Sequence, residues 1–364
     1  MKRITMSRTN EFKDASRMRT LLSAIHRITT KKWRIMEVCG GQTYALSRYR
    51  IEELLPEKIT MLHGPGCPVC VTPAIMIDRA LELASRPEVI FCTFGDMMRV
   101  PGSRKDLIQV KAEGGDVRMI YSPLDTLKIA TDNPKKEVIF FAIGFETTTP
   151  IYALLIQQAQ KRGIKNFSLL TAIYTIPAAI DLIAGDTDSR VNGLLAAGHV
   201  CAVTGTAKYK EIAARHKLPV TVTGFEPVDL LYGIYKTIKQ LEEETCRVEN
   251  GYSRVVSEKG NPKAWEAVQQ FSSLTILPGG LGEIPGSGLI LRPEYEHYNA
   301  EKRFIFTESA PIEKQICRAG KIMRGLMTPK QCPAFGKLCT PDHPEGAPMV
   351  SSEGVCSAYY RYNH

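Results

Sequence analysis

One local pattern recurs eight times along the chain and limits the folds open to it. Each copy is a short, apolar, β-branched run that ends abruptly in Gly, Pro or Cys, as a buried strand does. Between the copies lie stretches with apolar residues three and four apart, such as PAIMIDRALELAS, which predict helices. The predicted strands lie at residues 34–41, 59–68, 88–96, 116–123, 137–146, 167–177, 193–200 and 218–227. Strands that alternate with helices predict an α/β fold with parallel sheets covered on both faces.

The predicted strands form two consecutive sets of four, which predicts two similar Rossmann-like parallel-sheet domains within 364 residues. We expect the first α/β domain, with the Cys39 and Cys67/Cys70 loops, at residues 1–132 and the second at 133–245. The pattern stops after about residue 246, so residues 246–364 are predicted to form a small Cys-rich iron–sulfur domain. Residues 11–30 predict an amphipathic helix that packs on the first sheet or on this tail.

Composition and charge argue against several classes of protein. The longest apolar stretches have about eight residues, far short of the ~18 that a membrane span needs, and the start has no apolar signal segment. Ten cysteines in 364 residues are too few for a secreted disulfide scaffold. The formal charge of +9 comes from Lys and Arg scattered among 38 acidic residues, so solvated faces and acidic protein partners explain it better than nucleic acid. We therefore expect a cytoplasmic protein that binds neither nucleic acid nor membrane.

Chemically unusual residues follow the predicted strands, at the edge where parallel sheets bind ligands. They are Cys39, Gly40, Gly41, His63, Cys67, Cys70 and Asp96 in the first half, and Glu146, His199 and Glu226 in the second. Two such edges that face each other would form one cleft lined by thiols, carboxylates and a histidine. No GxxxxGK[ST] or GxGxxG motif signals a nucleotide phosphate.

The thiols near these strand ends each allow two interpretations. The Gly40-Gly41 pair after Cys39 makes either a simple tight turn or a loop whose N–H groups approach the sulfur, where a following helix N-terminus would lower the thiol's pKa. The segment Cys67-Pro68-Val69-Cys70 has the spacing of a dithiol oxidoreductase, but half of a zinc site has it too. We favour a reactive Cys39 and leave the second choice open.

The polar strand-end residues are equally ambiguous. Asp96, Glu146 and Glu226 are either functional carboxylates or helix caps and partners of Arg99 and other basic groups. A histidine such as His199 at a strand end is more often a structural residue with its hydrogen bonds made than a ligand of a metal or cofactor. The sequence therefore does not separate the structural from the functional role of these side chains.

Four more cysteines lie among Gly, Pro and short polar segments in the last 48 residues. Cys317, Cys332, Cys339 and Cys356 are separated by fourteen, six and sixteen residues. Structural zinc sites usually bring their ligands as two close CxxC pairs, which this tail lacks. Thiolates at wider spacing can surround a compact cubane, so the residues favour a [4Fe-4S] cluster over zinc and over the absence of a metal.

Six motifs in order closely resemble the HypD family of [NiFe]-hydrogenase maturation factors. They are MEVCGGQTY, HGPGCPVCVTP, FCTFGDMMRVPGS, GFETTTP, GFEPVDLL and the tail cysteines with AFGKLCTP and MVSSEGVCSAYY. The likeness runs from about residue 31 to the C-terminus. It implies two Rossmann-like domains plus a cluster domain, and a scaffold rather than a free-standing enzyme that assembles the Fe(CN)2CO group of the hydrogenase.

The same resemblance implies roles for the thiols and a set of partners. Cys39 would hold the iron of Fe(CN)2CO, Cys67 and Cys70 would be a redox dithiol, and the four tail cysteines would hold the [4Fe-4S] cluster. A HypC-type small chaperone would share the iron, a HypE-type protein would donate cyanide, and the hydrogenase large subunit would be served indirectly. The main rival is an iron–sulfur-dependent thiol–disulfide oxidoreductase that acts on another substrate; a structural zinc protein is the third class.

This chain departs from the family pattern at two positions. Many members read CGGHTH where this sequence has CGGQTY, so Gln42 and Tyr44 replace two histidines, and neither can shuttle a proton near neutral pH. His63 is a possible substitute. We therefore expect His63, Asp96 and Glu146 to act with the dithiol. We expect the cofactor to be bound by Cys39, Gly40, Gly41 and Glu226.

Overall fold

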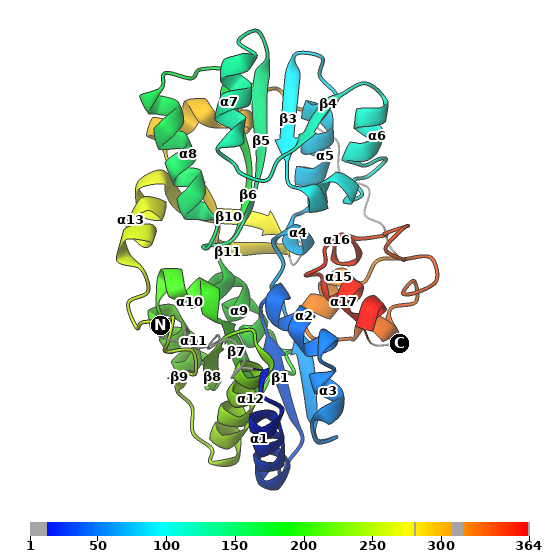
Figure 1. The fold of residues 1–364 in the computed structure, drawn as a ribbon, viewed down its shortest axis with the longest axis vertical. Coiled ribbons are helices and arrows are strands. Elements are labelled where there is room, and N and C mark those ends of the chain that lie inside the picture. The colour runs from blue at the N-terminus through cyan, green and yellow to red at the C-terminus, as the bar shows by residue number, and fades with distance from the viewer. Residues whose placement is uncertain (1–12, 280–281, 308–315, 363–364) are drawn as a thin grey trace, which may run out of the picture.

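The computed structural model describes residues 13–279, 282–307 and 316–362, and its centre is a pair of parallel sheets (Figure 1). All eight predicted strands are present, and every pairing among them is parallel. They are β1 (Trp33–Glu37), β2 (Ile59–His63), β3 (Val89–Thr93), β4 (Asp116–Met119), β5 (Glu137–Gly144), β6 (Phe167–Ile173), β7 (Gly193–Ala197) and β8 (Val220–Thr223). The predicted α/β fold with parallel sheets is confirmed.

The sheets do not contain the two consecutive sets of four strands that we predicted. One sheet has the order β2-β1-β7-β8-β9, where β9 is Val248–Asn250, and the other has the order β4-β3-β5-β6. The chain therefore starts in the five-stranded sheet, crosses to the four-stranded sheet for β3 to β6, and returns. The consecutive grouping was wrong because pairing between distant strands depends on tertiary packing, which local hydrophobic patterns do not encode.

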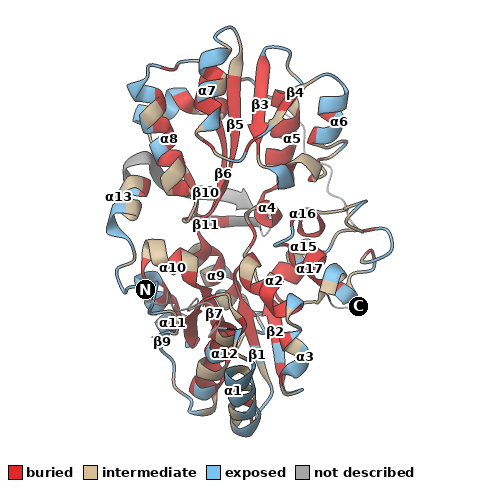
Figure 2. Ribbon diagram, in the orientation of Figure 1, coloured by how far each residue is buried: buried red, intermediate tan, exposed pale blue. Residues whose placement is uncertain are grey.

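Helices cover both sheets, and Figure 2 shows buried strands between helices whose outer faces are exposed. The N-terminal helix α1 (Ala15–Ile28) starts after Asp14, whose carboxylate accepts the N–H groups of Ser16 and Arg17. It packs on α12 (Pro227–Glu242), which lies on the five-stranded sheet. The other helices around the two sheets are α2 (Gly40–Arg48), α3 (Ile51–Leu54), α4 (Pro68–Val71), α5 (Ala74–Ala84), α6 (Leu107–Ala112), α7 (Asp125–Asp132), α8 (Thr149–Lys161), α9 (Ile176–Gly185), α10 (Gly198–Thr204) and α11 (Ala207–His216).

The residues after 246 divide between the α/β body and a separate cluster. Strand β9 extends the five-stranded sheet, while α13 (Pro262–Phe271) contacts α8 and the antiparallel hairpin β10 (Ser272–Gly279) and β11 (Gly282–Leu291) contacts β6. A short helix, α14 (Ala300–Arg303), follows the hairpin. Of these residues, only the described residues 316–362 gather around a hydrophobic cluster of their own, and we call this segment the tail from here on. Its helices are α15 (Ala319–Met323), α16 (Ala347–Val350) and α17 (Val355–Tyr362).

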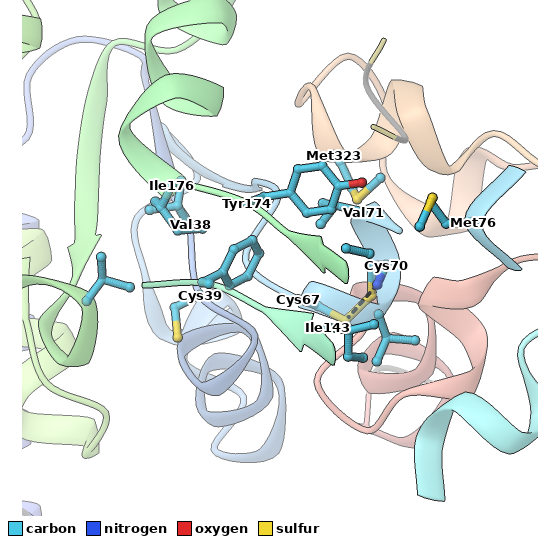
Figure 3. Close-up of a cluster of buried hydrophobic side chains, with 14 of the residues drawn as sticks. Val38, Cys39, Cys67, Cys70, Val71, Met76, Ile143, Tyr174, Ile176 and Met323 are labelled. Atoms are coloured by element: carbon cyan, nitrogen blue, oxygen red, sulfur yellow. Dashed lines mark hydrogen bonds between the residues drawn. A yellow bond between two sulfur atoms is a disulfide. The ribbon is translucent and has the colours of Figure 1, made fainter. Parts of the chain in front are cut away.

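The carboxyl ends of the two sheets face each other. Val38 after β1, Ile143 in β5 and Tyr174 after β6 belong to one buried cluster (Figure 3). The predicted strand-end residues Cys39, Cys67 and Cys70 therefore lie in one buried cluster where the two sheets meet. Within the ranges that the structure describes, no helix is long and apolar enough to cross a membrane.

Candidate functional site

Cys39 lies between β1 and α2, at the edge where the two sheets meet. It caps α2 in an extended conformation (φ −150°, ψ 125°), and its N–H donates to Glu37 Oε2 over 2.8 Å. Gly41 keeps the space beside the thiol open, because an added Cβ would lie 3.2 Å from the Phe225 ring and 3.6 Å from Cys39 Sγ. His199 Nδ1 lies 3.7 Å from Cys39 Sγ. The thiol and a histidine 160 residues further along the chain thus share one site.

Burial dominates the electrostatics of this pair. Burial raises the pKa of the Cys39 thiol far above its ordinary value, and the Glu37 carboxylate adds to the increase. The N–H groups of Gln42 and Gly41 favour the thiolate, as expected at a helix N-terminus, but they are outweighed, so the predicted lowering was wrong. Burial also lowers the pKa of His199 to about 4, which leaves its imidazole neutral near pH 7.

A buried hydrogen-bonded network connects Cys39 to the C-terminal helix α17. His63 Nδ1 lies 2.7 Å from Glu37 Oε1, and its Nε2 lies 3.0 Å from the hydroxyl of Tyr359. That hydroxyl donates to Glu52 over 2.8 Å. Burial disfavours the imidazolium, but the oxygens of Tyr359, Glu52 and Glu37 outweigh it and raise the pKa of His63 well above its usual value. The structure therefore places His63 between the Cys39 loop and the tail.

The predicted dithiol is closed and buried. Cys67 and Cys70 form a disulfide across the first turn of α4, with their Cα atoms 5.2 Å apart. Cys67 Sγ also accepts the N–H of Cys70 over 3.2 Å. Figure 3 shows both residues in one buried cluster with Ile143 of the four-stranded sheet and Met323 of α15. The dithiol thus lies where the α/β body meets the tail.

Glycines bring the two thiol loops into contact. A Cβ added at Gly66 would overlap the backbone N of Cys39, and the Gly66 carbonyl accepts the N–H of Gly40 over 2.9 Å. Gly40 is equally confined, because a Cβ there would overlap Glu353 of the tail. A narrow crevice between these loops is lined by Gly40, Cys67 and Cys70 from the body and by Pro348 and Glu353 from the tail.

We expect Gly66→Ala to lower the free energy of unfolding by about 3 kcal/mol, because the new methyl group must push the Cys39 backbone aside. Urea unfolding followed by circular dichroism measures the change. Gly95→Ala is the control, since its Cβ would meet only the end of the flexible Met119 side chain at 3.0 Å. Equal losses in the two variants would show that the contact between the loops is not tight.

Asp96 and Arg99 both bind the tail rather than each other. Asp96 lies in a 3-10 helix (Gly95–Arg99), and its Oδ2 accepts the hydroxyl of Ser351 over 2.7 Å. Arg99 Nη1 donates to the carbonyl of Pro341 over 3.2 Å. The structure therefore gives Asp96 a role in docking the tail, and its predicted catalytic role stays a prediction.

The other two predicted carboxylates lie in contrasting surroundings. Glu226 caps α12 without a side-chain hydrogen bond and forms a partly exposed ion pair with Lys13, with Nζ and Oε2 3.5 Å apart. The ring of its neighbour Phe225 contacts the His199 ring, so this loop reaches the Cys39 site through Phe225 although the Glu226 carboxylate pairs with Lys13. Glu146 is buried, and burial raises its pKa to about 7.

The four tail cysteines line a single cavity. They are Cys317, Cys332, Cys339 and Cys356, and all four are free thiols. Apolar side chains such as Ile322, Phe335 and Met349 complete much of the wall. Burial and the charges of the other three cysteines raise the pKa of Cys356 well above its ordinary value. Among the described residues, no three His, Cys, Asp or Glu side chains are grouped so as to hold a single metal ion.

The two positions that depart from the family pattern have structural partners. Gln42 is buried, and its Nε2 donates to Thr223 Oγ1 over 2.6 Å, which ties α2 to the end of β8. The Tyr44 hydroxyl accepts from Arg48 over 3.0 Å and from Tyr362 of α17 over 3.3 Å. These side chains therefore hold α2 against the sheet and the tail.

Sequence reasoning did not select His199 as a functional residue. It lies in Gly198-His199 at the end of a predicted strand, which is the same signal that selected Cys39 and Glu146. We interpreted His199 as a structural histidine whose hydrogen bonds are made at the strand end. That interpretation did not anticipate that His199 Nδ1 lies 3.7 Å from Cys39 Sγ, because β1 and β7 are neighbours only in the folded sheet.

Comparisons with known proteins agree over nearly the whole chain. A sequence model of the HypD family, described as "Hydrogenase formation hypA family", matches residues 16–363. The hydrogenase expression/formation protein HupD of Azotobacter chroococcum is 44% identical over 98% of this chain and 97% of its own. The hydrogenase maturation factor HypD of Rhodobacter capsulatus is 44% identical over 98% of both chains. The protein of that name from Escherichia coli is 44% identical over 90% of this chain and 89% of its own.

Proposed function

Because the chain belongs to the HypD family of hydrogenase maturation factors, we propose that it is the scaffold on which the Fe(CN)2CO group of [NiFe]-hydrogenases is assembled. One observation supports the proposal most directly. Pro348 lines both the dithiol crevice and the four-cysteine cavity, and Gly40, next to Cys39, lines the same crevice. Three sets of thiols thus adjoin one another. That arrangement suits a site that binds iron and receives electrons.

In this proposal the four tail cysteines hold a [4Fe-4S] cluster. Buried thiols around a largely apolar cavity fit a group that is rich in iron, because bound iron ions compensate both the burial and the mutual repulsion that raise the pKa of Cys356. When bound, such a cluster supplies electrons one at a time at low potential. The residues of the tail would orient it, and the crevice side of Pro348 would face the dithiol.

Cys39 is the proposed ligand of the iron that the scaffold carries as cargo. Iron that bears CO and cyanide prefers soft, electron-rich thiolates, which Cys39 and a cysteine of a HypC-type chaperone would supply. Since burial keeps the Cys39 thiol protonated, iron binding must release that proton. The neutral His199 ring, 3.7 Å away, is the proposed first acceptor, and because its pKa is about 4 it would pass the proton on to solvent. Glu37 would keep Sγ in position by holding the Cys39 N–H.

Cys67 and Cys70 are the proposed store of two electrons. The disulfide would take up two electrons and two protons and become two thiols, and the reverse step would return them. Among the residues that the structure describes, both side chains are buried where the body meets the tail, so a protein disulfide could not reach their sulfur atoms without a rearrangement. This burial favours the scaffold over the rival oxidoreductase.

Coexpression with a HypC-type chaperone and a HypE-type cyanide donor tests the proposed function. The chain should copurify with the small chaperone under anaerobic conditions and show infrared bands of iron-bound CO and cyanide. A complex without these bands that instead turns over a protein or small-molecule disulfide would favour the oxidoreductase. In that case the scaffold proposal fails.

The dithiol prediction can be tested by alkylation and mass spectrometry. In protein purified under air, Cys67 and Cys70 should resist iodoacetamide after unfolding, and both should react after reduction with dithionite. Cys246 is the internal control, because it is an exposed free thiol that should react in both samples. Full alkylation of Cys67 and Cys70 without reduction would contradict the prediction.

A further inference from the structure

A cavity of about 430 Å³ lies between the two halves of the body and shares no lining residue with the thiol crevice. Glu146 from the loop after β5 and Thr175 from the loop after β6 form one side. Residues of α9, α10, α11, α13 and β11, elements that Figure 1 labels, form the rest. The cavity is large enough for a small organic molecule, and nothing in the proposed assembly of iron uses it.

Glu146 is the unusual group in this cavity. It is 1% exposed; its Oε1 accepts the N–H of Ile176 over 3.0 Å, while Oε2 has no hydrogen-bond partner. Within the described ranges, no Lys, Arg or His forms an ion pair with this carboxylate. A buried carboxylate with no compensating cation and with one oxygen lacking a donor is costly, so this side chain suits a ligand that supplies a positive charge and a second donor.

The basic groups of the cavity are already neutralised by acidic partners. Lys208 Nζ lies 3.0 Å from Glu211 Oε2, and Arg215 Nη1 lies 2.5 Å from Asp181 Oδ2. Each pair cancels its own charge and lies among exposed parts of α9 and α11. The buried Glu146 therefore remains the uncompensated charge of the cavity, and it attracts cations rather than anions.

The remaining wall of the cavity is apolar and suits a flat ligand. Trp265 of α13, Ile212 of α11 and Pro285 of β11 line the cavity together with small side chains. An indole face stabilises a flat cation through stacking and cation–π attraction. The cavity thus combines one buried acceptor with an aromatic wall.

We propose that this cavity binds a planar aromatic cation whose N–H group donates to Glu146 Oε2 while its ring packs against Trp265. The proposal is independent of iron assembly at Cys39. Burial raises the pKa of Glu146 to about 7 although backbone N–H groups, among them that of Ile176, favour the carboxylate, so the carboxylate form that a cation needs is accessible near neutral pH.

Calorimetric titration with benzamidine and with benzamide tests the charge requirement. The two probes have nearly the same shape, but only benzamidine is a cation. We expect benzamidine to bind one site at least about tenfold more tightly than benzamide, the effect of one charge-assisted hydrogen bond. Glu146→Gln should remove this preference, and Glu53→Gln, which changes only an exposed pair with Arg50 outside the cavity, should keep it. Equal affinity for the two probes in the wild-type protein would overturn the proposal.

A second variant covers the case in which Glu146→Gln does not fold. Ala178 lines the cavity on α9 and is only partly buried, so Ala178→Leu should fold and reduce the space without touching the carboxylate. It should weaken benzamidine binding at least about tenfold. Binding should also change the fluorescence of Trp265, and Trp265→Phe should lose that change while Trp33→Phe retains it. Unchanged affinity in Ala178→Leu, or a signal that survives Trp265→Phe, would place the probe elsewhere and refute the proposal.

Discussion

Cys356→Ala should lose the iron and sulfide of the cluster and unfold the tail, while the α/β body remains folded. Cys356 is buried on α17 and lines the cavity with the other three tail cysteines. The described tail has only a small hydrophobic cluster, so the free energy of binding a metal group would supply much of its folding free energy. The same helix carries Tyr359, so unfolding of α17 should also break the hydrogen bond to His63.

Anaerobic purification followed by iron and acid-labile sulfide analysis measures the loss, together with absorption near 400 nm. Limited proteolysis should then cut the tail of the variant and leave the body intact. Cys246→Ala is the matched control, because this thiol is exposed and lies outside the tail cavity. The same result is expected for Cys317, Cys332 and Cys339. Full iron content in any one variant would remove that residue from the proposed ligand set.

Cys39→Ser should lose the infrared bands of CO and cyanide and retain both the fold and the cluster. Serine is nearly isosteric with cysteine, so the Gly40-Gly41 turn and the hydrogen bond to Glu37 should persist. The hydroxyl is a harder and much less acidic ligand than a thiol, so it should not hold low-spin iron. We expect the free energy of unfolding to change by about 1 kcal/mol or less.

Infrared spectra of the variant, purified with its small partner, measure the effect on the bound diatomic ligands. Cys201→Ser is the control, because this buried thiol lies two residues after His199 and is not a proposed ligand. It should keep the bands at the wild-type intensity. If the bands persist in Cys39→Ser, Cys39 does not hold the iron, and Cys67 or Cys70 becomes the next candidate.

The strands and the strand-end residues could be predicted because their signals are local. Each β-branched run that ends in Gly, Pro or Cys became a strand, from β1 through β8. The residues directly after them had to lie at the carboxyl edges of parallel sheets, whichever sheet each strand joined. That rule correctly brought Cys39 and the Cys67/Cys70 pair to one region, and it also applied to His199, which we discounted.

The partners of those residues were decided by the tertiary structure. The pairing of β1 with β7 brings His199 to Cys39, and no pattern within either segment encodes that pairing. Burial then reversed the expected pKa shift of Cys39, because desolvation depends on every element that covers the thiol. Glu226 and Asp96 found partners in Lys13 and Ser351, each more than 200 residues away along the chain. Sequence determines the local conformation and the chemical inventory, whereas distance, burial and charge compensation arise only when remote segments pack together.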